Sequence, residues 1–349
     1  MDLSRRTLMA GSAALAACGC TSAGRIAAQP SSDLTPEIEF ESFDTRFAEC
    51  IDMEQSGRLL STGHWWAEGP TWDRKRQRLY FTDVPRNRAY FWSAKEGDGI
   101  FLSPSGVDPK LAGGMRESGA NGLLIGHSGE LLICNHGSRA VESRDFETGD
   151  RTVLVDRYQG KKFNSPNDLI EASDGTIYFT DPPYGLEGLN ESPLKEMDRN
   201  GVYQLQRDRA VTRIIDDMTF PNGVALSPDG SALYVSQSDP DAPLIQRFLL
   251  RDGAIETSDG PEVWFDAKPY MHEAGGLPDG LAISAEGLVF LGGPGGVLVI
   301  TAEGKCLGRI GTGRATANCA FGEDGRTLFI TAKDRLVSVR TKVAGLGHF

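Results

Sequence analysis

The chain has 349 residues, of which 40% are hydrophobic, and this is enough to bury a large core in one or two domains. Its formal net charge is −12, and no Lys/Arg cluster is available to displace counterions, which argues against binding to a nucleic-acid backbone. Short apolar runs bounded by Gly, Asp, Asn and Pro, without long helical periodicity, predict an all-β protein.

The N-terminus is predicted to be an export signal, residues 1–28. Arg5 and Arg6 form a twin-arginine pattern, and the weakly apolar stretch that follows is too short to span a bilayer. The sequence LAAC, which ends at Cys18, resembles a bacterial lipoprotein box, so Cys18 is expected to carry a lipid anchor; the alternative is cleavage by a general signal peptidase, for example after Ala28. Residues 29–36 are predicted to form a tether and residues 37–349 a single domain in the bacterial periplasm.

A short sequence motif recurs six times in this domain. Each copy begins with an acidic or amide residue, here called an opener, and an apolar run follows ten or eleven residues later, in five copies after a Gly-containing turn. Several short strands per unit and six units in one register predict a six-bladed β-propeller. An N-terminal strand between residues 38 and 60 is expected to join the last blade. The openers are Glu68, Asn121, Asn167, Asn222, Asp279 and Asn318.

The openers are predicted to form a ring, because equivalent residues on the innermost strand of every blade surround the central axis. Two carboxylates and four amides offer oxygen ligands with a total charge of −2, which suits a hard divalent cation and favours Ca²⁺ over Mg²⁺. The alternative is that Asn-Gly and Asp-Gly only form turns. Against it, Glu68 is not a turn former, and the turns of most repeats lie six to eight residues later.

The chain resembles the gluconolactonase and regucalcin family of calcium-dependent six-bladed propellers. The motifs that carry the resemblance are WAEGPTW, SPNDLIEASDGTIYFTDPPYGL, PNGVALSPDG and LPDGLAISAEG. The resemblance covers about residues 65–340. It implies one metal at the channel floor, with Mg²⁺, Mn²⁺ or Zn²⁺ as alternatives to Ca²⁺, and Asn121 and Asn318 as flanking residues. The ligands that it implies are Glu68, Asn167, Asn222 and Asp279.

The expected activity is hydrolysis of a sugar lactone, with the cation polarising the carbonyl for attack by water. Asp279 is the candidate acceptor near the attacking water, and His136 is a candidate acid or base, with a structural or substrate-binding histidine as the alternative. Esterase or organophosphate hydrolase activity, or a non-catalytic binding role, are the alternative functions. The residues expected to contact a small-molecule lactone are Asn121, Asn167, Tyr184 and Asn318, with Arg139, Lys161 and Lys162 as further candidates.

Two insertions and four cysteines complete the prediction. Residues 185–199 and 238–243 are either lids over one face or surface decoration. No C-x-x-C spacing is present, so no zinc or redox motif is expected. After the leader, the cysteines are expected in the core, with a disulfide left open: Cys50, Cys134, Cys306 and Cys319.

Overall fold

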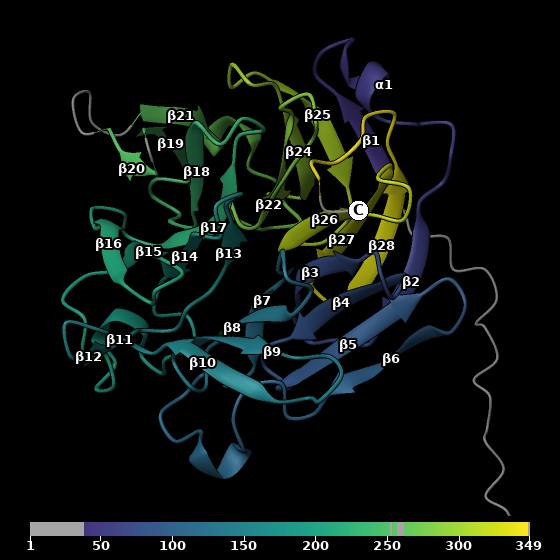
Figure 1. Ribbon diagram of the computed structural model, residues 1–349. Helices are drawn as coiled ribbons and strands as arrows, with labels where there is room; N and C mark the ends of the chain where they lie inside the picture. Colours follow the sequence, from purple (N-terminus) through teal and green to yellow (C-terminus); the bar gives the residue numbers. More distant parts are fainter. Residues whose placement is uncertain (1–37, 252, 257–261, 348–349) are drawn as a thin grey trace, which may run out of the picture. The chain divides into compact units, whose positions relative to one another are not determined.

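A computed structural model of the chain describes residues 38–251, 253–256 and 262–347. The predicted leader with Cys18 and the predicted tether lie outside the described residues. Six antiparallel sheets surround a common axis (Figure 1), which confirms the all-β six-bladed propeller.

Each sheet is one blade, and its strands follow one another outward from the axis. The first blade is β3 Ala67–Asp73, β4 Arg78–Asp83, β5 Arg88–Ser93 and β6 Gly97–Leu102, and the second is β7 Ala120–Ile125, β8 Leu131–Asn135, β9 Ala140–Arg144 and β10 Arg151–Val155. The third blade is β13 Leu169–Glu171, β14 Ile177–Asp181, β15 Gly201–Leu205 and β16 Val211–Ile215, and the fourth is β17 Pro221–Leu226, β18 Ala232–Gln237 and β19 Leu244–Arg251, with β20 Ala254–Ile255 and β21 Glu262–Asp266 both paired to β19. The fifth blade is β22 Leu281–Ile283, β23 Val289–Gly293, β24 Gly296–Ile300 and β25 Cys306–Gly311, and the sixth is β26 Asn318–Gly322, β27 Thr327–Ala332 and β28 Arg335–Arg340.

The ring is closed by the innermost strands and by the N-terminal part of the domain. Strands β3, β7, β13, β17, β22 and β26 each pack against the next, and β26 packs against β3. Strand β2, Arg58–Thr62, pairs with β28 and completes the last blade. An N-terminal strand therefore closes the propeller as expected, although it begins only at Arg58. Strand β1, Glu39–Ser42, extends the fifth blade beside β25.

The core lies between the blades. The second strands β4, β8, β14, β18, β23 and β27 carry the apolar runs of the repeat and are buried almost throughout, because neighbouring blades cover both of their faces. Trp72 of the first blade, for example, stacks on Phe329 of the last, with ring centroids 5.5 Å apart. The four cysteines after the leader are free and buried, which confirms that they are core residues.

Helical structure is sparse in the described part of the chain. It consists of α1, Phe47–Cys50, and 3₁₀ turns at Pro109–Leu111, Leu189–Glu191 and Lys268–Tyr270, while β11 Arg157–Tyr158 and β12 Lys161–Lys162 form a separate hairpin. None of the helices in the described residues has the length and apolar character needed to cross a membrane.

Candidate functional site

The openers stand where the innermost strands begin, and several of them sit at β-bulges. The pairing register shifts between Glu68 and Thr71, between Ala120 and Leu123, and across Asn222 between Pro221 and Val224. A bulge adds one residue to a strand and redirects a side chain, and bulges are common next to active sites. The bulges therefore give Glu68, Asn121 and Asn222 an orientation that a regular strand would not.

The glycines that follow the openers allow the inner strands to approach one another closely. A Cβ at Gly223 would lie 2.2 Å from the backbone oxygen of Asp279 in the next blade, and one at Gly69 would lie 2.1 Å from that of Asn121. Asn222-Gly223 lies within β17 and is therefore not a hairpin turn. The alternative interpretation of the openers as turn formers is wrong for these residues, because their glycines serve packing at the axis.

Hydroxyl groups of one blade hold the openers of the next. Thr180 Oγ1 donates to the backbone oxygen of Asn222 over 2.6 Å, and Ser236 Oγ donates to that of Asp279 over 2.6 Å. Thr82 Oγ1 donates in the same way to Asn121, over 3.1 Å. The second strand of each of these blades thus positions a site residue that comes about 40 residues later in the chain.

Glu68 and Asp279 come together on the axis as a pair of like charges. Glu68 is buried and accepts hydrogen bonds from Trp66 Nε1 at 3.3 Å and from the Gly69 amide at 3.1 Å. Burial raises the pKa of Glu68 to about 8. Burial, followed by the charges of Glu68 and Asp168, raises the pKa of Asp279 well above its ordinary value. Neither carboxylate forms an ion pair with a Lys or Arg among the described residues, so the pair lacks a compensating positive charge.

The two predicted amide ligands lie on the neighbouring inner strands. Asn222 Nδ2 donates to Ser238 Oγ over 2.8 Å, and the Asn222 side chain lies within hydrogen-bonding reach of Asp279. Asn167 is buried, and its backbone is fixed by hydrogen bonds to β14 and to Gly122. Two carboxylates and two amide oxygens without nearby positive charge fit a hard divalent cation.

This donor set depends on the amides. Across the described residues, no group of three or more His, Cys, Asp or Glu side chains is placed to hold a metal ion. A cation at the axis would therefore need the oxygens of Asn167 and Asn222 as well as the carboxylates.

Asp168 is a site residue that sequence reasoning missed. It occupies the position that Gly69, Gly122 and Gly223 hold in other blades, and this departure from the repeat was the available signal. Its carboxylate accepts from the amides of Leu169 at 3.0 Å and Val224 at 3.3 Å, which ties the third blade to the fourth. Burial raises the pKa of Asp168 to about 7.

His136 lies fully buried beside Asn121. Its Nε2 is 3.4 Å from Asn121 Nδ2, and its Nδ1 is 3.9 Å from Glu117 Oε2 without a hydrogen bond to any described residue. Burial lowers the pKa of His136 to about 3, so the ring is neutral at neutral pH and accepts a proton poorly. This geometry favours the structural alternative, in which His136 orients the Asn121 amide, over proton transfer.

The His136→Asn variant is expected to tolerate acid better than the wild type. A histidine that titrates near 3 when folded and near 6.5 when unfolded binds protons preferentially in the unfolded state, so it lowers stability as pH falls from 6.5. Between pH 7 and pH 5 the wild type should lose about 2 kcal/mol of unfolding free energy relative to the variant. Urea unfolding of both proteins at the two pH values measures this; a difference that does not change with pH would contradict the buried neutral imidazole.

The start of one predicted insertion is joined to a segment that the sequence did not reveal. Met115 bridges to Leu186, and the amides of Arg116 and Glu117 donate to the Gly185 oxygen at 2.9 and 3.3 Å. Residues 103–117, between β6 and β7, are thus fastened to the start of the predicted insertion at 185–199. In the second insertion, Ser238 contacts Asn222 as described above.

Tyr184 directly precedes the insertion at 185–199. Its ring stacks on Phe220, with centroids 5.9 Å apart and planes 16° from parallel. Its hydroxyl lies beside Asn222 and Ser238, close enough to Asp279 for the charges to interact. The structure thus places Tyr184 next to the candidate ligands.

The cationic residues suggested for substrate recognition contact backbone groups. Arg139 is buried and donates from Nε to the Phe163 oxygen over 2.6 Å, and its predicted contact with substrate stays a prediction. Lys161 and Lys162 form the β12 strand of the separate hairpin, and Lys162 Nζ binds the backbone oxygen of Ser138.

Asn318 differs from the other openers because it pairs in regular register with Thr331. Its Oδ1 accepts from the Cys319 amide at 2.8 Å, and a Cβ at Gly280 would collide with its side chain. Its predicted contact with substrate stays a prediction.

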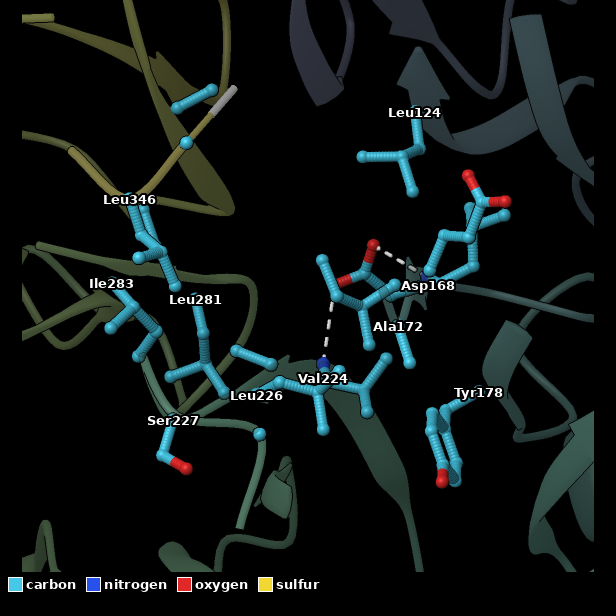
Figure 2. A pocket seen from close by; sticks show the side chains of 18 of the residues that line it. Leu124, Asp168, Ala172, Tyr178, Val224, Leu226, Ser227, Leu281, Ile283 and Leu346 are labelled. Atoms are coloured by element: carbon cyan, nitrogen blue, oxygen red, sulfur yellow. Dashed lines mark hydrogen bonds between the residues drawn. The ribbon is translucent and has the colours of Figure 1, made fainter. Parts of the chain in front are cut away.

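A cavity of about 530 Å³ adjoins Asn318 and Asp168. Figure 2 shows apolar side chains around it, including Leu124, Leu226 and Leu281. These residues follow the openers along the inner strands, so the cavity lies beyond the ring.

Comparison with known proteins agrees with this architecture. Residues 66–334 match the family described as "SMP-30/Gluconolactonase/LRE-like region". The gluconolactonase of Zymomonas mobilis is 41% identical over 306 residues, which cover 87% of this chain and 86% of that protein. The solved structure of a gluconolactonase from Xanthomonas campestris is 30% identical, covers 90% of this chain and 99% of its own, and superposes with a TM-score of 0.75.

Regucalcin from Agrobacterium tumefaciens, described as a calcium-binding protein, is 19% identical over 84% of this chain and 96% of its own, with a TM-score of 0.65, and it supports the fold alone. A family match over most of the domain, joined by 41% identity to one relative, confirms the resemblance, and the chain belongs to the SMP-30/gluconolactonase/LRE-like family.

Proposed function

We propose that this protein hydrolyses a sugar lactone with the help of a divalent cation, Ca²⁺ by preference. The observation that carries the proposal is the carboxylate pair of buried Glu68 and partly exposed Asp279, which has no cationic partner among the described residues and stands beside Asn167 and Asn222. Gluconolactonases among the relatives point to glucono-1,5-lactone as the first substrate to test.

The four ligands would be Glu68, Asn167, Asn222 and Asp279. When bound, the cation would supply Lewis-acid polarisation of the lactone carbonyl. Neutral amides and few carboxylates favour Ca²⁺ over the smaller Mg²⁺.

The residues around the ring would bind and orient the lactone. Asp279, which is partly exposed, would accept a proton from the attacking water, and the neutral His136 beside Asn121 would hold the Asn121 amide. Asn121 and Asn167 are amides suited to sugar hydroxyls. The segment around Arg116, fastened to Gly185, would restrict the entry of bulk water.

Purified leaderless protein is expected to hydrolyse glucono-1,5-lactone well above the spontaneous rate. Removal of divalent cations by a chelator should reduce this activity at least tenfold, and Ca²⁺ should restore it better than Mg²⁺, Mn²⁺ or Zn²⁺. Acid release in a pH-stat measures the rate, with spontaneous hydrolysis subtracted. Binding of Ca²⁺ at 100 times its dissociation constant should also add about 2.7 kcal/mol to the unfolding free energy.

Full activity after chelation would contradict the metal-dependent mechanism. Ca²⁺-dependent stabilisation without any lactone hydrolysis would keep the cation site and reject the substrate class.

A further inference from the structure

The Tyr184 hydroxyl is an unused hydrogen-bond donor at the candidate site. The hydroxyl atom is buried and has no hydrogen-bond partner among the described residues. Asn222 and Ser238 lie near enough to interact with the hydroxyl, but only as donors that lower its pKa against the larger rise caused by burial. Their own donors are directed elsewhere, because Asn222 Nδ2 donates to Ser238 Oγ and Ser238 Oγ donates to the Pro278 oxygen over 2.5 Å. A buried donor left without an acceptor costs stability, so its presence points to an acceptor that arrives with a ligand.

The backbone on both sides of Tyr184 is held rigidly. Ser165 Oγ donates to the Pro182 oxygen over 2.6 Å and accepts from the Gly185 amide over 2.9 Å. No side chain fits at Gly185, because a Cβ there would lie 2.8 Å from the Ser165 side chain and 2.9 Å from that of His136. With its ring stacked on Phe220, Tyr184 presents its hydroxyl in a fixed position.

We propose that the Tyr184 hydroxyl is a catalytic hydrogen-bond donor to the carbonyl oxygen of the lactone, a role that rests on the proposed function. Water adds through its oxygen to the carbonyl carbon, and the π electrons of the C=O bond move onto the carbonyl oxygen as negative charge. The C=O bond then re-forms while the bond to the ring oxygen breaks. The proton lost by the water ends on the ring oxygen, which gives the hydroxy acid, and Tyr184 retains its proton throughout.

The test compares Tyr184→Phe with Tyr203→Phe. Tyr203 in β15 also has a buried hydroxyl without a partner in the described structure, but it packs between Phe163 and Phe179 in the core of the blades. For Tyr184→Phe we expect kcat on glucono-1,5-lactone to fall about 100-fold with KM changed less than about threefold, as for loss of one preorganised oxyanion donor. Tyr203→Phe should keep the wild-type kcat.

Thermal unfolding of both variants separates catalysis from folding. Because neither hydroxyl has a partner to lose, neither substitution should lower the thermal midpoint. A lower midpoint for Tyr184→Phe would reveal a structural partner for the hydroxyl and overturn the proposal, as would a kcat within threefold of an active wild type. A wild type that hydrolyses no lactone would instead reject the proposed function itself, together with this role.

Discussion

The Asp279→Asn substitution is expected to abolish lactone hydrolysis while making the cation-free protein more stable. Asp279 and Glu68 are like charges held together on the axis, and each pays for desolvation without a cationic partner among the described residues. Because both pKa values are raised, the cation-free protein must either protonate these carboxyl groups or bear their repulsion, and both cost stability near neutral pH. An uncharged amide at position 279 avoids this cost and should add about 1–3 kcal/mol to the unfolding free energy after chelation. The same change removes a ligand and the candidate proton acceptor, so kcat/KM should fall about 1000-fold.

The measurement is thermal unfolding with chelator and with Ca²⁺, alongside lactone hydrolysis. The wild type should gain stability from Ca²⁺, whereas Asp279→Asn should begin higher and gain little. Asp241→Asn is the matched control, because it makes the same change of charge on an exposed loop of the fourth blade. If Asp279→Asn destabilises the chelated protein while Asp241→Asn does not, the two carboxylates do not destabilise each other. Their lack of a positive partner would then be no argument for a bound cation.

The blades could be predicted because the same physical requirement recurs in each. A buried second strand gives an apolar run, and an inner strand that begins at the axis gives a polar opener at a constant distance before it. The register between Asn167 and the run at Ile177 is the same as that between Asn121 and the run at Leu131. Repetition therefore made visible a site whose residues are far apart in the chain.

The remainder of the site does not follow the repeat. Glu117 comes near His136 through a segment that has no periodicity, and this segment is held by pairing with Gly185, almost 70 residues later. The sequence suggested His136 as an acid or base because it does not reveal how the folded chain packs around that residue. Packing buries His136, and burial lowers its pKa. Asp168 was hidden for the opposite reason, since an Asn-Asp pair before a strand resembles ordinary loop chemistry.

The Asn-Gly pairs show how one local pattern can serve two purposes. Short-range preference favours a turn at Asn222-Gly223, whereas the structure uses the pair in a bulged inner strand. Glycine is needed here because the next blade leaves no room for a side chain, a requirement set by ring closure and not by local conformation.

The Gly223→Ala variant tests this requirement, and we expect its unfolding free energy to fall by about 3 kcal/mol. The added methyl would lie 2.2 Å from the Asp279 oxygen and 2.8 Å from Gly280 Cα, and backbone atoms cannot rotate aside as a flexible side chain does. Gly113→Ala is the control, since a Cβ there meets no atom within 4 Å and the position does not need a positive φ. Urea unfolding of both variants, with and without Ca²⁺, measures the effect. Relief of the clash must move the backbone of Asp279, a candidate ligand, so Gly223→Ala should also weaken Ca²⁺ binding at least tenfold. A loss of stability with unchanged Ca²⁺ affinity would show that the close packing of the inner strands supports the fold without positioning Asp279.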